Sequence, residues 1–322
     1  MTKNDSIDLL QDKFSIHHVL ASSIVSRFGI KNIEEQAEEF LDNGKPSPFV
    51  KWVGGKRQLL KQFRELDLYP PSLFNPRTNT YFEPFAGGGA LFFDLLPEKA
   101  VLTDMNEELV IAYNVIKNDV EKLIVKLKKH KKENTKEYFL KIRAKDVEKM
   151  TDIARAARFI YLNKTAFNGL YRVNSKNGFN VPYGKYNNPN IADVENLRLV
   201  SGSLKGTTIK HADYKMVLDT AKKGDFVYFD PPYYPVSRTS SFTSYTRDAF
   251  LEKEQIELRE TFLELHKRGC YVMLSNSDTT FMRQIYAGLS DIIKIHTVQA
   301  ARAINSNANG RGKVSELVIT NY

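Results

Sequence analysis

Short apolar runs alternate with amphipathic segments along most of the chain. From Phe49 onward, runs rich in β-branched and aromatic residues each lead into a stretch with apolar positions at helical spacing. This alternation predicts parallel βαβ units, in which a mainly parallel sheet carries helices on both faces. The expected strands begin near Tyr81, Ala100, Thr207, Asp225 and Cys270. The pattern therefore indicates an α/β fold.

Two parts of the chain depart from this alternation. Residues 5–42 have apolar positions at roughly helical spacing, and the sequence GKPSP that follows has the composition of a linker. Residues 117–165 are helix-like and charged, whereas 166–190 are dense in Asn, Gly, aromatic and basic residues, as in an exposed recognition loop or hairpin. The predicted domains are a helical extension (1–47), a catalytic domain in two parts (48–116 and 206–322) and an insertion (117–205).

The charge of the chain is concentrated after the first 47 residues. The whole chain has 47 Lys and Arg against 38 Asp and Glu, a net charge of +9. The first 47 residues hold 5 of the basic and 8 of the acidic residues, so the remainder holds 42 and 30, a net +12. Such a surplus favours a polyanionic partner, although a lysine-rich protein without one would have the same composition.

Several classes of protein are disfavoured by what the sequence lacks. Cys270 is the one cysteine, which excludes intrachain disulfides and a cysteine-rich metal cluster. There is no apolar run long enough to span a membrane and no signal-peptide pattern. A soluble cytoplasmic protein is expected.

A glycine turn follows the first predicted strand. Residues 85–89, Phe-Ala-Gly-Gly-Gly, lie where a strand becomes a helix, and Asp104 closes the next strand. Glycines permit close approach of a ligand to the backbone, and a carboxylate at that position can accept hydrogen bonds from ribose hydroxyls. Phe92 occupies the place of the last glycine of a dinucleotide fingerprint, and GGKRQ (54–58) lacks the hydroxyl residue of a P-loop. The turn favours another nucleoside-bearing cofactor, although a simple tight turn would look similar.

The apolar run 226–229 stops abruptly at Asp230-Pro231-Pro232-Tyr233. Neither proline can donate to a strand ladder, but each keeps its carbonyl and has a fixed φ. A carboxylate, a pre-aimed carbonyl and an aromatic ring thus stand together where a strand ends. A strand-ending turn with a buried aspartate would account for this set without any ligand.

Taken in order, the motifs resemble the Dam-type DNA adenine-N6 methyltransferases. The resemblance runs from about residue 48 to the end of the chain and implies a Rossmann-like methyltransferase sheet with an inserted, mainly helical target-recognition domain. DPPY alone is shared with RNA- and protein-methylating enzymes, whereas the ordered set is more specific. The stretches concerned are FVKWVGGK (49–56), FEPFAGGG (82–89), TDMN (103–106), YLNKTAFNGLYRVNSKNGFNVPYGKY (161–186), DPPY (230–233) and INSNANGRGKVSEL (304–317).

The resemblance implies S-adenosylmethionine as cofactor and no metal, because a sulfonium already carries an activated methyl group. Asp104 would accept hydrogen bonds from the ribose, Asp213 would face the adenine amino group of the cofactor, and Asp230 would border both cofactor and substrate. The implied cofactor-binding residues are Trp52, Lys56, Phe85, Gly87, Gly89, Asp104, Asp213 and Asp230.

The resemblance also implies how the target is methylated. The amine of an adenine rotated out of the duplex would lie between Asp230 and the carbonyl of Pro231, with Pro232 fixing the turn and Tyr233 stacking on the base. Positive charge grows on the amine nitrogen during attack, so the carboxylate helps most in the transition state.

Double-stranded DNA is the implied partner, and 5′-GATC-3′ the implied site. Lys51 would read the guanine before the target adenine, and Phe167 would wedge between base pairs. The remaining implied contacts are Asn168, Arg172, Pro182 and Tyr186 in the recognition segment and Arg311 and Lys313 near the DNA backbone. Three alternatives stay open: a related site beginning with GA, an RNA or protein amino-methyltransferase, and a DNA-binding module that has lost catalysis.

Overall fold

The computed structural model describes residues 1–14, 44–174, 178–236, 250–301 and 313–322, and within 15–43 only residues 21, 25, 29–35 and 37. The chain forms two compact units. The first unit comprises Met1–Gly55, Gly87–Lys99 and Asp104–His211, and the second comprises Lys56–Ala86, Ala100–Thr103 and Ala212–Tyr322. The division cuts the motifs FVKWVGGK, FEPFAGGG and TDMN and the stretch HADY (211–214) that contains Asp213, so each of them contributes residues to both units.

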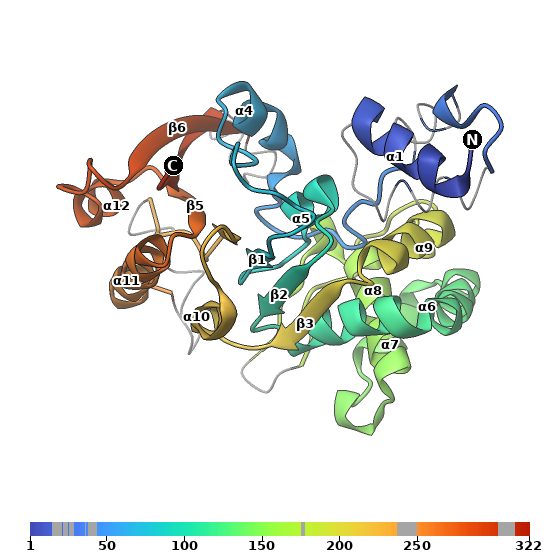
Figure 1. The fold of residues 1–322 in the computed structure, drawn as a ribbon. Helices are drawn as coiled ribbons and strands as arrows, with labels where there is room; N and C mark the ends of the chain where they lie inside the picture. Colours follow the sequence, from blue (N-terminus) through green and yellow to red (C-terminus); the bar gives the residue numbers. More distant parts are fainter. Residues whose placement is uncertain are drawn as a thin grey trace. The chain divides into compact units, whose positions relative to one another are not determined.

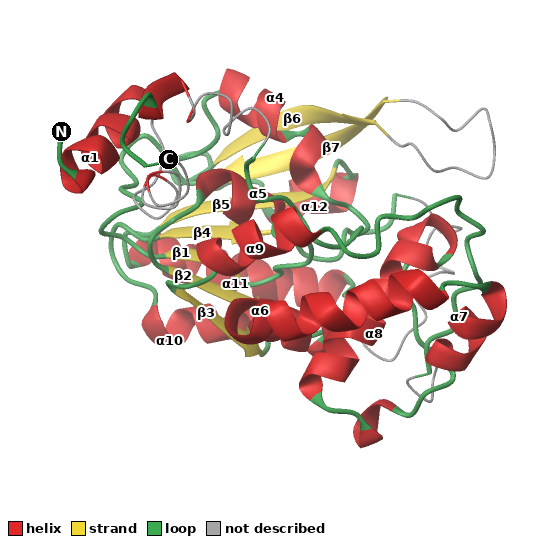
Figure 2. Cartoon of the chain, turned by 90° about the vertical axis from the view of Figure 1, so that its right-hand side faces the viewer, coloured by secondary structure: helices red, strands yellow, loops and turns green. Residues whose placement is uncertain are grey.

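Seven strands form one sheet in the order β3-β2-β1-β4-β5-β7-β6 (Figures 1 and 2). Pairing is parallel for β1 with β2, β1 with β4 and β4 with β5, and antiparallel for β7 with both β5 and β6. The parallel part and the flanking helices confirm the predicted α/β class, but the antiparallel edge was not predicted. The strands are β1 (Tyr81–Glu83), β2 (Ala100–Asp104), β3 (Thr207–His211), β4 (Phe226–Phe229), β5 (Tyr271–Ser277), β6 (Lys294–Ala301) and β7 (Lys313–Thr320).

The core of the second unit lies between the central strands and its helices. Every residue of β1 and β4 is buried, as expected for strands covered on both faces. Leu258 and Phe262 of the longest helix pack into the same apolar cluster as Val227 and Phe229 of β4. The helical segments of this unit are η1 (Lys56–Gln58), α4 (Leu60–Glu65), η4 (Tyr214–Met216), α10 (Val217–Thr220), α11 (Glu252–Lys267) and α12 (Thr280–Ile285).

The first unit is mainly helical. Its longest helix, α6, bends at Asp119, where the backbone leaves helical geometry, and it runs beside α8 (Figure 2). Side chains of Asn106, Thr135 and Asp193 cap the N-termini of α6, α7 and α9 by accepting backbone N–H groups. The segments are α1 (Lys3–Phe14), α5 (Ala90–Leu95), α6 (Glu107–Glu133), α7 (Lys136–Arg143), η2 (Val147–Lys149), α8 (Asp152–Thr165), η3 (Phe167–Gly169) and α9 (Val194–Ser203).

The described residues of 166–190, which are 166–174 and 178–190, form the predicted hairpin-like loop. Antiparallel bridges join Ala166 to Tyr183 and Val173 to Phe179. The Phe167 N–H donates to the carbonyl of Pro182 at 2.9 Å, which closes the base of the loop. The predicted exposure is also found, because the Phe167 side chain is 52% exposed.

The N-terminal extension packs within the first unit. Ile7 and Leu10 of α1 join a buried apolar cluster with Leu96, and Leu199 of α9 packs against it. Most of the predicted helical segment 15–42 lies outside the described residues. A search of the described residues finds no helix with the length and apolarity needed to cross a membrane. The predicted functional boundaries after residues 47, 116 and 205 stay predictions.

Candidate active site

The Asp230 corner, residues 230–233, follows β4 directly in the second unit. Parallel strands end at the same edge of a sheet, so the corner lies where ligands of α/β sheets commonly bind. Lys56 of η1 reaches it, and its Nζ lies 2.7 Å from Oδ1 of Asp230. The Lys56 side chain is 5% exposed and that of Asp230 is 21% exposed. The ion pair compensates the charge of a buried lysine with that of a partly buried carboxylate.

Burial raises the pKa of the Asp230 carboxyl above its ordinary value, and the Lys56 ammonium partly offsets this rise. A more basic carboxylate is a stronger hydrogen-bond acceptor. It also has acceptor capacity beyond one ammonium, because two oxygens offer about four lone-pair directions. The sequence placed Lys56 at the cofactor, whereas the structure gives it a direct contact with Asp230; its predicted contact with cofactor stays a prediction.

The aromatic ring of the corner is also fixed. The Tyr233 hydroxyl donates to Oε2 of Glu316 at 2.9 Å, and Lys56 Nζ lies 4.7 Å from the centre of the Tyr233 ring. A cation over the face of an aromatic ring is attracted by the π-electrons of the ring. Lys56 therefore contacts both Asp230 and Tyr233. Glu316 lies in the closing stretch KVSEL (313–317), but no role was predicted for it.

Two buried amide side chains hold the proline turn by hydrogen bonds to its backbone. Gln255 of α11 donates to the carbonyl of Pro232 at 3.0 Å, and its own Oε1 accepts from Asn276 of β5 at 3.0 Å. Oδ1 of Asn276 accepts from the N–H of Tyr234 at 3.0 Å. Both amide side chains are buried, so the turn is held by satisfied hydrogen bonds on rigid elements. No sequence motif indicated these two residues.

Phe85 contacts the Tyr214 ring in the second unit, and Asp213 directly precedes Tyr214 in the chain. The Phe85 ring stacks on Tyr214 with centroids 5.4 Å apart, and Phe250 contacts both rings edge-on. Asp213 is exposed and caps η4, because its Oδ1 accepts from the Lys215 N–H at 2.9 Å. An exposed carboxylate beside an aromatic cluster suits a flat base with an amino group, as predicted for the cofactor's adenine.

The glycine turn belongs mostly to the first unit, and two of its glycines are conformationally required. Gly87 and Gly89 have φ of 46° and 68°, values that residues with a side chain rarely adopt. A Cβ on Gly87 would lie 2.7 Å from the Trp52 ring, and one on Gly89 would lie 2.7 Å from the Tyr113 hydroxyl. Trp52 thus packs directly on the turn, as its predicted role requires.

Asp104 binds this turn through one oxygen and its own chain two residues later through the other. Oδ2 accepts from the Gly87 N–H at 2.9 Å, and Oδ1 accepts from the Asn106 N–H at 2.8 Å. Burial raises the pKa of Asp104, and these two N–H groups counteract part of the rise. Each oxygen keeps a lone pair for a further donor. A carboxylate can accept hydrogen bonds from the two ribose hydroxyls, whereas it repels a phosphate. The residues present therefore fit the nucleoside of S-adenosylmethionine.

The predicted base-reading residues gather in the first unit. Lys51 is exposed, and its Nζ lies 4.6 Å from the centre of the Tyr186 ring. Asn168 is exposed with a left-handed backbone, φ 55°, and Arg172 donates to Oδ1 of Asn180 at 2.7 Å. Pro182 is exposed and closes the loop with Phe167. Of the predicted phosphate contacts, Arg311 lies outside the described residues, and of Lys313 the structure describes only the backbone, which starts β7.

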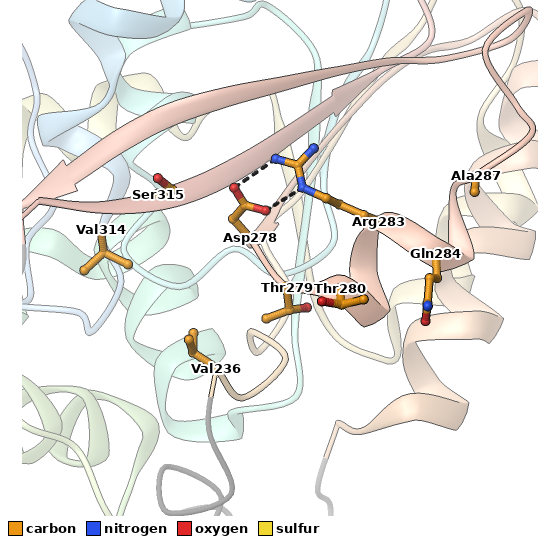
Figure 3. Close-up of a pocket in the computed structure, with 9 residues that line it drawn as sticks. All are labelled: Val236, Asp278, Thr279, Thr280, Arg283, Gln284, Ala287, Val314 and Ser315. Carbon is orange, nitrogen blue, oxygen red and sulfur yellow. Dashed lines mark hydrogen bonds and ion pairs between the residues drawn. The ribbon is translucent and has the colours of Figure 1, made fainter.

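A hollow of about 660 Å³ also lies in the second unit (Figure 3). Asp278 accepts two hydrogen bonds from Arg283 across it, at 2.7 and 2.9 Å, so the guanidinium charge is already compensated. The described residues that line it include none of the predicted site residues: they are Val236, Asp278, Thr279, Thr280, Arg283, Gln284, Ala287, Val314 and Ser315. In the same described part of the chain, no group of three or more His, Cys, Asp or Glu could hold a metal.

Comparisons with known proteins agree with this geometry. A sequence model of the family described as D12 class N6 adenine-specific DNA methyltransferase matches residues 52–304. The chain is 46% identical over 281 residues to the type II methyltransferase M1.LlaDCHI of Lactococcus lactis subsp. cremoris, covering 85% of this chain and 95% of that protein. It is 43% identical over 291 residues to the type II methyltransferase M.MjaIII of Methanocaldococcus jannaschii, with coverage of 85% and 99%.

A third relative carries a different name. The DNA adenine methylase of Escherichia coli strain K12 is 31% identical over 272 residues, covering 84% of this chain and 93% of the relative. The matches extend over almost the full length of all three relatives. The chain belongs to the D12 class of N6 adenine-specific DNA methyltransferases.

Proposed function

We propose that the protein transfers a methyl group from S-adenosylmethionine to N6 of an adenine in duplex 5′-GATC-3′, after rotating that adenine out of the helix. The observation that carries the proposal is the Asp230 corner, where an ion-paired carboxylate and a proline carbonyl follow β4 directly. Membership of an adenine-specific DNA methyltransferase family fixes the class of reaction. The names of relatives such as DNA adenine methylase support the choice of DNA as acceptor.

The corner makes a weak nucleophile reactive. The lone pair of an exocyclic adenine amine is delocalised into the ring, so the amine attacks poorly. Asp230 accepts a hydrogen bond from one N–H group of the amine, and the Pro231 carbonyl accepts one from the other. These two hydrogen bonds draw the nitrogen toward tetrahedral geometry. Positive charge then grows on nitrogen, and the fixed carboxylate stabilises the transition state more than the ground state. Proline contributes rigidity, since its φ is fixed and its carbonyl does not need to be oriented during the reaction.

Bound S-adenosylmethionine supplies a methyl carbon activated by a sulfonium. In the first unit, Asp104 would accept its ribose hydroxyls, and the backbone of Gly87 and Gly89, with Trp52 packed against it, would border the nucleoside. In the second unit, Phe85 and Asp213 would contact the cofactor's adenine, and Lys56 and Asp230 would border the methyl donor.

Contacts between the protein and duplex DNA must supply the free energy for base rotation. Extrusion of one base costs about a few kcal/mol, and stacking on an aromatic such as Tyr233 returns about 1–3 kcal/mol. The exposed Phe167 ring can fill the gap left in the stack. Lys51 would read the first guanine, and the net +12 of the chain after residue 47 would attract phosphates.

The direct test uses purified protein, labelled S-adenosylmethionine and three acceptors. The acceptors are a duplex with one GATC, a duplex of the same composition with those four bases permuted, and an RNA duplex of the GATC sequence. Label on the adenine of the first acceptor alone supports the proposal. Label on the RNA, on protein, or equally on both DNA duplexes would refute the proposed substrate.

A further inference from the structure

We propose that Asn163 is a positioning residue for base recognition. Its side-chain amide joins Lys51 to the 167–169 turn, and we infer that this joint sets how well the enzyme discriminates the first base pair of its site. The inference rests on the proposed function, in which Lys51 reads the guanine before the target adenine. No motif or comparison assigns a role to this residue.

One amide makes three hydrogen bonds to backbone of two separate segments. Asn163 stands in the last turn of α8 and is fully buried. Its Oδ1 accepts the N–H of Lys51 at 2.8 Å, and its Nδ2 donates to the Lys51 carbonyl, also at 2.8 Å. The second Nδ2 hydrogen goes to the carbonyl of Gly169 at 2.8 Å. The amide therefore binds both the N–H and the carbonyl of Lys51, as a residue on a neighbouring β-strand does.

The orientation of the amide is determined by its partners. The reverse orientation would direct its NH₂ at the Lys51 N–H and its oxygen at two carbonyls, which would lose all three hydrogen bonds. An aspartate at this position has the same shape but no donor. It would keep the bond from the Lys51 N–H and place an anionic oxygen against the carbonyls of Lys51 and Gly169.

The joint controls the Lys51 side chain as well as its backbone. Gly169 has φ 64°, and a Cβ there would lie 2.4 Å from Cδ and 2.7 Å from Cβ of Lys51. The lysine stem therefore lies along the glycine backbone that Asn163 holds. Beyond the stem, the ammonium lies 4.6 Å from the centre of the Tyr186 ring. These contacts leave an exposed lysine with few orientations.

Lys51 can discriminate between bases only if its flexible side chain is held in one orientation. A lysine free to rotate can reach a phosphate or another base edge and then favours no sequence, whereas a fixed one favours the acceptors of guanine. Phe167 and Asn168, which precede Gly169 in the same turn, are both exposed. Asn163 thus connects the predicted guanine reader to the predicted wedge.

The test compares Asn163→Asp with Asn196→Asp as a matched control. Asn196 of α9 makes the same kind of amide bridge, accepting the Ser47 N–H at 2.8 Å and donating to the Ser47 carbonyl at 3.0 Å, four residues before Lys51. Each protein is assayed for kcat/KM on a GATC duplex and on the duplex with adenine in place of the first guanine. The ratio of the two values is the discrimination, and S-adenosylmethionine binding is measured by calorimetry.

We expect Asn163→Asp to lower discrimination by about tenfold or more, toward the value for Lys51→Ala, with cofactor binding unchanged. The double variant Asn163→Asp/Lys51→Ala should discriminate no worse than Lys51→Ala alone, because both changes remove one function. Asn196→Asp should keep the discrimination of the unaltered protein. Unchanged discrimination in Asn163→Asp, or an equal fall in Asn196→Asp, would overturn the inference.

A second variant covers the case in which Asn163→Asp does not fold. Gly169→Ala leaves the amide in place but puts a methyl group where the lysine stem lies, and it should lower discrimination in the same way. If Gly169→Ala keeps full discrimination, the inference fails. If the unaltered protein does not methylate the GATC duplex, the proposed function fails instead, so the two failures are distinguishable.

Discussion

The Asp230 corner and the Lys51–Asn163 joint hold their functional groups in opposite ways. At the corner, the carboxylate is held by a buried lysine 2.7 Å away, and burial raises its pKa. At the joint, the charged group is exposed, and a neutral buried amide holds its backbone. An acceptor that must be strong in the transition state gains from a desolvated site, whereas a base-reading cation must stay accessible to DNA.

This difference implies that the two regions can be changed separately. Substitutions at the corner should slow methyl transfer on every DNA sequence, and substitutions at the joint should change which sequence is preferred. Four predictions test this separation.

Asp230→Asn should have the largest effect. The amide keeps the shape but loses the charge that stabilises the developing cation on the amine, so the single-turnover rate should fall by about 10²–10³ or more. Binding of a GATC duplex, measured by fluorescence anisotropy, should stay within a few-fold of the unaltered value. Asp278→Asn is the matched control, because Asp278 pairs with Arg283 and not with Lys56. A rate loss no greater than that of the control would exclude Asp230 from catalysis.

Lys51→Ala should lower discrimination at the first base pair by about 5- to 150-fold, the range for loss of a Lys contact to guanine. Transfer at GATC itself should fall less than the discrimination does. The assay is kcat/KM on the two duplexes that differ at the first guanine. An equal loss on both duplexes would show that Lys51 contributes general affinity and reads no base.

Lys56→Met should change the pH dependence of the reaction. The reaction needs Asp230 as the carboxylate, so activity falls as pH drops through its pKa. The ammonium lowers that pKa, so its removal should raise it and move the acid limb of kcat/KM to higher pH. A displacement of about one pH unit corresponds to a tenfold loss on the acid limb.

The control for this profile is Lys61→Met on α4, whose lysine forms an exposed pair with Glu65. It should leave the acid limb in place. An acid limb that Lys56→Met moves to lower pH, or does not move, would contradict the assigned ion pair.

Tyr233→Phe and Glu316→Gln should have the smallest effects, each a few-fold in rate. Both weaken the hydrogen bond that fixes the ring, which is worth about 1–3 kcal/mol when one partner is charged. Because they remove the same interaction, the double variant should be little worse than either single one. Additive losses in that double-mutant cycle would mean that Glu316 acts on something other than Tyr233.

Much of the parallel sheet could be predicted from the sequence, because its signals are local. The runs at 226–229 and 271–274 are continuous apolar stretches, and DPPY and the glycine turn end their strands abruptly. The antiparallel edge was missed for a physical reason. The place of β7 between β5 and β6 depends on pairing such as Leu274 with Ile319, far apart in the chain, and no local pattern encodes that choice.

The supporting residues of the site were missed for a related reason. Asn163 reads as one polar position in a helix, and Glu316 as one polar position in a strand. What makes each one matter is the group it meets, the Lys51 backbone 112 residues earlier and the Tyr233 hydroxyl 83 residues earlier. Motifs therefore indicated which residues meet substrate, and the structure was needed to find the residues that hold them.

The most direct test maps the methyl groups that the enzyme adds to DNA. Plasmid DNA from a host without adenine methylation is incubated with S-adenosylmethionine and the unaltered protein or Asp230→Asn, and modified bases are located by sequencing. We predict N6-methyladenine at the adenine of GATC with the unaltered protein and almost none with the variant. Methylation of cytosine, of adenines regardless of sequence, or undiminished methylation by Asp230→Asn would contradict the account.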